Sequence, residues 1–339
     1  MAFFLNKLKE NGHLEQVHMT ICSVGSRKLS SSDDFGDSDW NIFAPHLAIY
    51  GFDADADACD AANEDLETRQ IAWTERHIPI ALADDVGEST LYVTNNPMCS
   101  SLYPPNEPFL NRFVGLPELV NLDFTIDLET TTLDVFCQEE GIETIDFLKV
   151  DVQGAELLVF KGGERSLKNM LAIQTEVSFS PLYLDQPLFS DVDTYLRARG
   201  FALFGFLFPN SMNIRRRSPV RPSNRPGQLL WADAIYLKDL LADEVEPSSK
   251  TPQALLKLAC IADTLGFPDY SLEILEYLTL NYGEDSRFNV SDSLIGSLTA
   301  LPELRQTGLS SLPIVQSIKD FISKDCIKKN NLEALLIDE

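Results

Sequence analysis

The chain has 339 residues, of which 44% are hydrophobic, and this length suits one large globular domain or two. Its formal net charge of −25 and its pI of about 4.4 surround it with a negative field, which repels phosphate backbones and argues against nucleic acid as a partner. No apolar run in the sequence is long enough to span a bilayer, so no membrane span is expected.

Six cysteines lie far apart, at positions 22, 59, 99, 137, 260 and 326, and no two form a CxxC pair. This spacing argues against a zinc ribbon and against a disulfide framework. It favours a reducing, cytoplasmic location. The N-terminal stretch MAFFLNKLKENG has no basic segment ahead of its apolar patch, so it does not predict a signal peptide.

Apolar strands alternate with helices from residue 17 to about residue 239. The predicted strands, in chain order, cover residues 17–25, 46–53, 76–83, 89–94, 122–129, 144–152, 170–179, 201–208 and 229–237, with 89–94 and 122–129 as additional strands or a hairpin arm. The predicted helices follow Asp55, open at Thr131 or Thr132 and close at Gly141, cover residues 154–169, and run from Ser190 to Gly200. This order predicts an α/β fold with a mostly parallel sheet covered by helices on both faces.

The composition changes after about residue 242, where a polar segment with Pro and Ser begins. We therefore expect an α/β domain at residues 1–242, a linker at 243–250 and a helical C-terminal region at 251–339. Two amphipathic helices joined by a short turn are predicted within residues 251–283. One such hairpin does not indicate a repeat protein.

Polar residues follow the predicted strands at the points where those strands end. In an open parallel sheet, ligands bind beyond the carboxyl ends of the strands, where the strand order reverses. The residues at these ends are Gly25, Asp53, Asp84, Asp151 and Glu176. Each carboxylate alone could be a helix cap or part of a solvated turn. Five such strand ends at one edge of the sheet predict a ligand site there.

The stretch YGFDADADACDAANED places aspartates at 53, 55 and 57, almost at the spacing of an EF-hand calcium loop. Ala58 stands where that loop needs glycine, and a predicted strand stands where it needs a helix, so we do not expect calcium. Asp53 instead can accept hydrogen bonds from two vicinal ribose hydroxyls, while Asp55 and Asp57 complement the start of a helix. The loop after the first strand lacks G-x-G-x-x-G, which argues against a dinucleotide cofactor.

The stretch IDFLKVDVQGAELLVFKGG, with SSLYPPNE, QTEVSFSPLY, LWADAIYL and IYGFDAD elsewhere, resembles the FkbM family of S-adenosylmethionine-dependent methyltransferases. The resemblance covers residues 15–240 and is strongest at 145–183. It implies a class I methyltransferase fold, which is Rossmann-like, with a seven-stranded sheet whose last strand is antiparallel. It also implies S-adenosyl-L-methionine as cofactor and O-methylation of hydroxyls on sugars, polyketides or related metabolites.

The resemblance also implies roles for individual residues. Gly25 would line the methionine part of the cofactor, Asp53 would hold the ribose, Asp84 would lie near the adenine, and Asp151 would face the transferred methyl group. Asp151 is the first candidate for a catalytic base and Glu176 the second. The chemistry requires no metal, although a magnesium ion held by carboxylates stays open. The loop CSVGSRK departs from the family, which usually has an acid followed by two spaced glycines, because Cys22 stands where that acid would be.

A basic loop at residues 213–228 stands out in this acidic chain. Its residues Arg215, Arg216 and Arg217 are candidates for substrate binding, as part of a lid that captures an anionic acceptor. The alternative is a solvated loop with no ligand.

Two classes of function remain open. The first is an O-methyltransferase acting on a sugar, a glycan or a small metabolite. The second is a catalytically silent Rossmann-like binding module that has lost its cofactor. A nicotinamide oxidoreductase is disfavoured by the missing glycines, and a DNA or RNA methyltransferase by the charge and by DVQG at the fourth strand end. The acceptor and the oligomeric state stay undetermined, with a homo-oligomer among the alternatives.

Overall fold

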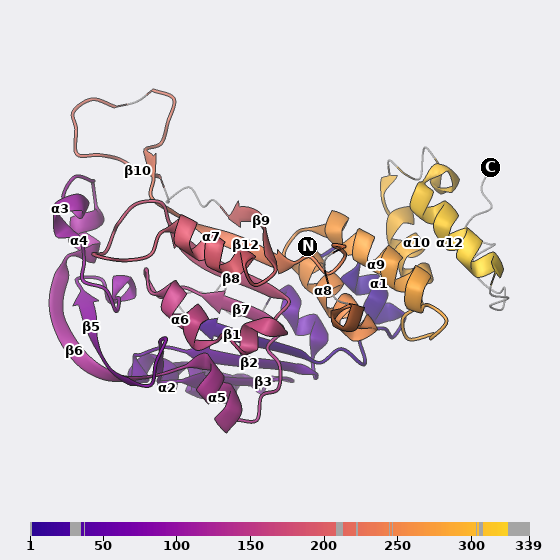
Figure 1. Ribbon diagram of the computed structural model, residues 1–339, viewed down its shortest axis with the longest axis horizontal. Coiled ribbons are helices and arrows are strands. Elements are labelled where there is room, and N and C mark those ends of the chain that lie inside the picture. The colour runs from indigo at the N-terminus through magenta and orange to yellow at the C-terminus, as the bar shows by residue number, and fades with distance from the viewer. Residues whose placement is uncertain are drawn as a thin grey trace. The chain divides into compact units, whose positions relative to one another are not determined.

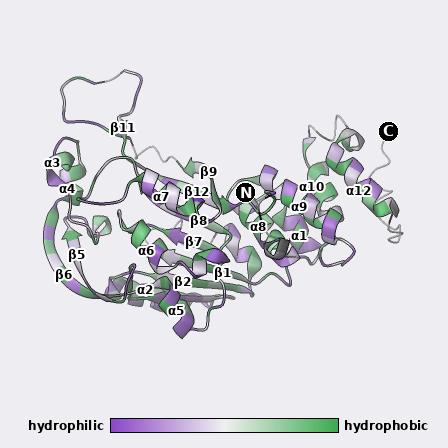
Figure 2. Cartoon of the chain, in the orientation of Figure 1, coloured by the Kyte–Doolittle hydropathy of each residue, from purple (hydrophilic) through white to green (hydrophobic). Residues whose placement is uncertain are grey.

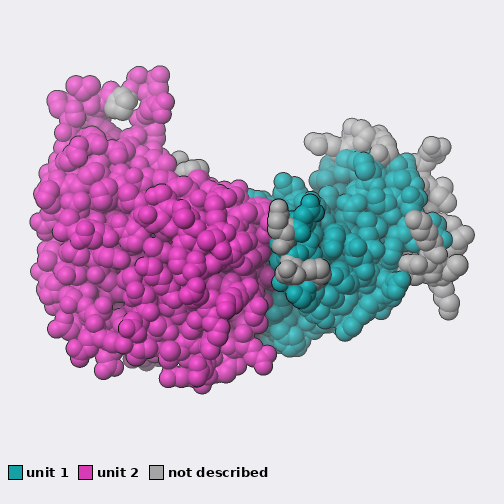
Figure 3. Space-filling view, viewed as in Figure 1, with its two compact units in different colours: residues 1–19, 35–47, 240–339 teal, residues 20–34, 48–239 magenta. Residues whose placement is uncertain are grey.

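The computed structural model describes residues 2–27, 35, 36, 38–207, 213–221, 223–243, 245, 247–302, 304 and 308–324. The chain divides into two compact units, coloured separately in Figure 3. Unit 1 comprises residues 1–19, 35–47 and 240–339, and unit 2 comprises residues 20–34 and 48–239. The predicted domain and linker boundaries at residues 242 and 250 stay a prediction.

The strands and helices alternate along unit 2, and helices dominate the end of the chain (Figure 1). The strands are β1 Met19–Val24, β2 Leu47–Phe52, β3 Thr74–Ile78, β4 Ala81–Leu82, β5 Gly87–Thr94, β6 Leu122–Thr131, β7 Phe147–Val150, β8 Ala172–Ser178, β9 Phe201–Leu207, β10 Asn213–Ile214, β11 Gln228–Leu229 and β12 Trp231–Lys238. The α-helices are α1 Leu5–Glu10, α2 Ala56–Arg69, α3 Glu107–Leu110, α4 Leu116–Val120, α5 Leu133–Glu139, α6 Glu156–Gly162, α7 Phe189–Arg197, α8 Pro252–Thr264, α9 Pro268–Tyr282, α10 Ser291–Thr299 and α12 Pro313–Lys324. Short 3-10 helices are η2 Asp39–Phe43, η3 Pro97–Cys99, η4 Ser166–Lys168, η5 Pro247–Ser249 and η6 Leu309–Ser311.

The main sheet has seven strands in the order β3-β2-β1-β7-β8-β12-β9. β7 pairs in parallel with β1 and β8, while β12, the last strand in the chain, runs antiparallel to β8 and β9. The order reverses direction between β1 and β7. This is the strand arrangement that the family resemblance implies, and it confirms the predicted fold class.

Helices cover both faces of this sheet. On one face, α5, α6 and α7 bury residues such as Phe136, Phe160 and Leu196 against Val150 and Tyr236 of the strands. Helix α2 connects β2 to β3 in the opposite direction along the sheet, so a right-handed connection places it on the other face. Burial of these apolar side chains is the main force that holds the layers together.

A second sheet of three strands, in the order β4-β6-β5, extends from unit 2 as a curved arm at the edge of Figure 1. β5 and β6 pair antiparallel from Gly87 to Thr94, which confirms the predicted hairpin arm. The single strand predicted at residues 76–83 was wrong, because the chain divides there into β3 of the main sheet and β4 of the arm. Pro79 lies at the division, and it has no N–H to continue a strand ladder.

Two of the three predicted helix N-caps were confirmed. Asp55 accepts a hydrogen bond from the Ala58 amide and begins α2, and Thr132 accepts from the Val135 amide and begins α5, as predicted. The Ser190 cap was wrong. The N-cap of α7 is Leu188, two residues earlier, because the Asp191 carboxylate accepts a hydrogen bond from the Leu188 amide at 2.8 Å. No helix in the described part of the chain is long and apolar enough to cross a membrane.

Unit 1 contains the predicted pair of C-terminal helices as α8 and α9. Asp263, near the end of α8, is 2% exposed, and its carboxylate lies at the start of α1. It accepts hydrogen bonds from the amides of Phe3, Phe4 and Leu5 at 2.8, 2.7 and 3.1 Å. These amides have no partner within their own helix, so a side chain more than 250 residues away caps α1.

Replacing Asp263 with Ala should therefore destabilise the protein by about 3–5 kcal/mol, because buried amides without partners cost about 1–3 kcal/mol each. Urea unfolding followed by circular dichroism measures the change. Asp269→Ala, in the exposed first turn of α9, is the matched control and should cost less than about 1 kcal/mol. Equal losses in the two variants would show that Asp263 does not act as the cap.

Candidate functional site

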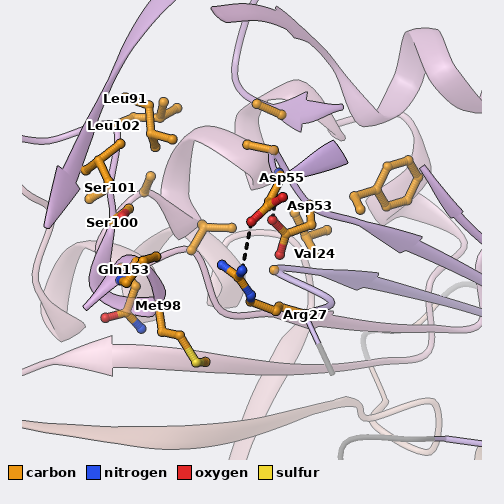
Figure 4. A pocket seen from close by; sticks show the side chains of 18 of the residues that line it. Val24, Arg27, Asp53, Asp55, Leu91, Met98, Ser100, Ser101, Leu102 and Gln153 are labelled. Carbon is orange, nitrogen blue, oxygen red and sulfur yellow. Dashed lines mark hydrogen bonds and ion pairs between the residues drawn. The ribbon is translucent and has the colours of Figure 1, made fainter. Parts of the chain in front are cut away.

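A cavity of about 560 Å³ opens in unit 2 at the carboxyl ends of β1, β2 and β7, where the strand order reverses. This is the position at which open α/β sheets bind ligands. Its lining comes from the loop after β1, the loop after β2 and the start of α2, the loop between β3 and β4, the arm strands β5 and β6, the segment 97–102, and the loop after β7. Figure 4 shows part of this lining.

Gly25 brings the ends of β1 and β7 together. Its φ is +76°, and a Cβ atom at this position would lie 1.9 Å from the carbonyl oxygen of Asp151. The Asp151 amide donates a hydrogen bond to Val24, and the Gly25 amide donates to Phe52 at the end of β2. Only glycine combines this backbone angle with this close approach. Gly25 and Asp151 both line the cavity.

Asp53 and Asp55 lie side by side at the cavity and do different work (Figure 4). Asp55 caps α2 and forms an ion pair with Arg27 at 2.8 Å. Asp53 accepts a hydrogen bond from the Asp55 amide at 3.0 Å, and burial raises the pKa of its carboxyl. Arg27 is the single cation among the described residues that line the cavity, and sequence reasoning had missed it although it follows Gly25 by two residues.

A buried series of polar side chains contacts the loop after β1. The Ser26 hydroxyl lies 3.1 Å from Nδ1 of His77, and Nε2 of His77 lies 3.2 Å from the carboxylate of Glu75. Trp73 donates from Nε1 to the same carboxylate at 2.8 Å. The residue types are those of a nucleophilic triad, but Ser26 is only 9% exposed and does not line the cavity. We therefore infer that this series of hydrogen-bonded side chains holds the loop after β1, which begins at Gly25, in place.

Gln153 connects the end of β7 to that of β8. Its amide nitrogen donates to the carboxylate of Asp151 at 2.7 Å and lies 3.5 Å from that of Glu176. Its side-chain carbonyl oxygen lies 3.3 Å from the hydroxyl of Tyr183. That hydroxyl makes its shorter hydrogen bond, of 2.7 Å, to the backbone carbonyl of Cys99. Gln153 has a φ of +56°, in the left-handed region that non-glycine residues rarely occupy. Strain of this kind concentrates at functional sites. This cluster joins the segments around residues 100, 153 and 183 that carry the family resemblance.

Four carboxyl groups gather around Gln153. Asp151 lines the cavity, while Glu176 lies behind it, and burial followed by the charge of Asp151 raises the pKa of Glu176 well above its usual range. Burial also raises the pKa of Asp233 and brings that of Glu156 to about 7. The Glu156 carboxylate accepts hydrogen bonds from the Val152 and Gly154 amides at 3.1 and 3.0 Å, which orders the loop beside Asp151.

Asp84 does not join the other predicted site residues. Its side chain is exposed and is not part of the cavity lining. Ile80, Ala81 and Leu82 line the cavity in its place. The difference follows from the division of the predicted third strand, since the chain turns into β4 before it reaches Asp84.

The three arginines of the basic loop also lie outside the cavity lining. The Arg216 guanidinium lies 4.8 Å from the centre of the Phe113 ring. Arg217 donates to the Phe113 carbonyl at 3.0 Å and forms an ion pair with Glu118 at 2.7 Å. The Arg215 carbonyl accepts a hydrogen bond from Val114. These contacts attach the start of the loop to the segment between α3 and α4 and to Glu118 of α4.

The side of the cavity opposite the aspartates combines apolar residues of the arm with a few polar residues. Figure 4 shows Leu91 and Leu102 across the cavity from Asp53 and Arg27, with Ser100, Ser101, Met98 and Gln153 on the same side as the two leucines. We call six lining residues from the arm and the segment after it the apolar wall: Leu91, Val93, Met98, Leu102, Phe124 and Ile126. Within the described residues, no group of three or more His, Cys, Asp or Glu side chains is arranged to hold a metal ion.

The profile of the Methyltransferase FkbM domain family matches residues 32–203, a little over half of the chain. The 2-O-methyltransferase NoeI of Sinorhizobium fredii (strain NBRC 101917 / NGR234) is 45% identical to this chain over 67 residues. That match covers 20% of this chain and 28% of NoeI, so it spans less than a third of that relative.

Solved methyltransferases align at low similarity. The magnesium protoporphyrin IX methyltransferase ChlM of Synechocystis PCC 6803, solved with bound SAM, has a TM-score of 0.31 and 9% identity over 69% of this chain and 76% of that one. TrmK of M. capricolum, solved with S-adenosyl-homocysteine, has a TM-score of 0.34 and 8% identity over 95% of this chain and 98% of that one. The fold assignment rests on the strand order instead.

The family profile covers β2, α2, the arm, β7 and β8, together with Asp53 and Asp151 at the cavity and Gln153, Glu176 and Tyr183 beside it. With this match across more than half of its length, the chain belongs to the FkbM family of methyltransferases.

Proposed function

We propose that this protein transfers a methyl group from S-adenosylmethionine to a hydroxyl of a sugar, a glycan or a small metabolite. The observation that carries the proposal is the cavity at the switch point of the sheet, with glycine at the end of β1, an aspartate at the end of β2 and another at the end of β7. Family membership supports the reaction class, and the partial similarity to a 2-O-methyltransferase supports oxygen as the acceptor atom.

The residues of the cavity fit the parts of this cofactor. Asp53 can accept hydrogen bonds from two ribose hydroxyls, and Gly25 allows close approach of the backbone. Arg27 can pair with the carboxylate of the methionine portion. Ile80 and Leu82 offer an apolar surface to the adenine, in place of the exposed Asp84.

When bound, S-adenosylmethionine supplies a methyl group activated by a positive sulfonium, which an acidic cavity favours. Asp151 would accept the proton of the acceptor hydroxyl during transfer of this methyl group to the hydroxyl oxygen, with S-adenosylhomocysteine as the other product. Gln153 holds the Asp151 carboxylate by a 2.7 Å hydrogen bond. The cavity walls align the reacting groups and keep water out, which is the main contribution to a displacement of this kind.

Calorimetric titration of the full chain with S-adenosylmethionine and S-adenosylhomocysteine tests the proposal. Binding of both is expected, and Asp53→Ala should weaken it by about 100-fold or more, since two hydrogen bonds to a charged group are worth about 1.5–3 kcal/mol each. Asp60→Ala is the matched control, because Asp60 is exposed on α2 and is not part of the cavity lining, and it should change affinity by less than about threefold.

Absence of binding to either compound would contradict the proposal. The second function, a binding module that keeps the sheet but has lost its cofactor, would then be favoured by the loop after β1 with its single glycine.

A further inference from the structure

One face of the β5–β6 arm is apolar and turned toward the cavity. Leu91 pairs with Ile126, and Val93 pairs with Phe124, across the two strands. Side chains alternate between the faces of a strand, so directly paired residues share a face. All four line the cavity. Figure 2 shows hydrophobic and hydrophilic residues along β6, as this alternation requires.

The apolar face of the arm is exposed to solvent. Phe124 is 51% exposed and Ile126 is 43% exposed, although both are large and apolar. Contiguous exposed apolar surface in a concave site marks a ligand-binding wall, because the hydrophobic effect favours its removal from water. Met98, at 36% exposure, adds to the same surface.

The cofactor proposed above does not use this face. Its polar groups match Arg27 and Asp53, on the loops after β1 and β2, and its adenine matches Ile80 and Leu82. Leu82 lies on β4, opposite Thr131 at the C-terminal end of β6 and away from Phe124. In Figure 4 Leu91 and Leu102 lie across the cavity from Asp53 and Arg27, on the same side as Gln153. The arm therefore faces the second reactant, whose hydroxyl has to reach Asp151.

A free sugar, with hydroxyls around its ring, would bury little apolar surface on this wall. We propose that the acceptor is an amphipathic molecule, with an alkyl or aromatic portion that packs on Leu91, Val93, Phe124 and Ile126 while its hydroxyl lies at Asp151. This inference rests on the proposed function and narrows its substrate class.

Alkyl β-D-glucosides are suitable probes, because they join a hydroxylated ring to an alkyl chain of chosen length. Butyl, hexyl and octyl glucoside, below micelle-forming concentrations, are titrated by calorimetry into the full chain saturated with S-adenosylhomocysteine. Each added methylene that the wall covers should tighten binding by up to about fourfold. The double variant Phe124→Ser, Ile126→Ser should lose this dependence on chain length while its affinity for S-adenosylhomocysteine stays unchanged.

Leu122→Ser is the matched control, because Leu122 lies on the same strand and is 40% exposed, yet it is not part of the cavity lining. It should keep the chain-length dependence. Equal affinity for butyl and octyl glucoside would overturn the inference. The inference would also fail if the double variant lost as much affinity for S-adenosylhomocysteine as for octyl glucoside, because the apolar wall would then bind the cofactor. Failure of the wild type to bind S-adenosylhomocysteine contradicts the proposed function instead, and the glucoside series without it still tests the wall.

Discussion

Replacing Asp151 with Asn should lower kcat for methyl transfer by about 10²–10⁴-fold, the usual contribution of a general base to an acceptor that is a poorly acidic alcohol. Asn keeps the size of the side chain but cannot take the proton. Affinity for S-adenosylhomocysteine should change little, because the proposed role of this carboxylate is to receive the proton of the acceptor. Single-turnover kinetics with a responsive acceptor separates the chemical step from binding. An unchanged rate would show that Asp151 is not the base.

Glu176→Gln is the matched comparison, and it separates the two candidate bases. Burial, with Asp151, Glu156 and Asp233 nearby, raises the pKa of Glu176, so this side chain keeps its proton at pH values where an exposed glutamate has lost it. Gln resembles that protonated form. The variant should therefore keep kcat within about threefold at pH 6. If kcat of the wild type changes as pH rises through the pKa of Glu176, the variant should lack that change. A larger loss than that of Asp151→Asn would make Glu176 the base.

Replacing Gly25 with Ala should destabilise the protein by about 2–5 kcal/mol and abolish cofactor binding. The φ of +76° alone costs a non-glycine residue about 1–2 kcal/mol. The new Cβ would also lie 1.9 Å from the carbonyl oxygen of Asp151, so the ends of β1 and β7 would have to separate. Urea unfolding measures the loss.

Gly87→Ala controls for the substitution itself. Gly87 begins β5, and a Cβ atom there would meet nothing within 4 Å. Its stability should stay within about 0.5 kcal/mol of the wild type. If Gly25→Ala proved as mild as Gly87→Ala, the close approach of β1 and β7 would not constrain the site.

The sheet was predictable because its signals are local. Apolar runs bounded by turn residues marked β1, β2, β7, β8, β9 and β12, and the caps at Asp55 and Thr132 involve partners three residues away. The prediction that polar strand ends meet at one edge agrees with the common position of Gly25, Asp53 and Asp151 at the cavity. Strand order itself was not predicted, since apolar runs alone do not determine which strands are neighbours, and the family resemblance implied only seven strands with the last one antiparallel.

The parts that escaped prediction depend on contacts distant in sequence. Gln153 acts through Glu176 and Tyr183, 23 and 30 residues away, and its left-handed φ has no signature in the letters DVQG. Likewise, the contact between Ser26 and His77 joins residues 51 apart. Asp84 lies outside the cavity lining for a local reason, because β3 ends at Ile78, before Pro79, and the chain enters β4 of the arm before it reaches Asp84.

The capping of α1 by Asp263 also has a consequence for synthesis on the ribosome. Leu5 and Asp263 are 258 residues apart, so the first amides of α1 leave the exit tunnel long before their acceptor exists. Unit 2, in contrast, has all of its residues once Asp239 has emerged. During synthesis the methyltransferase sheet can therefore fold first, whereas residues 1–19 can complete their unit only after residues 240–339 have been made. A ribosome that stalls before residue 263 would display a nascent chain in which the amides of Phe3, Phe4 and Leu5 lack the carboxylate that caps them in the folded protein.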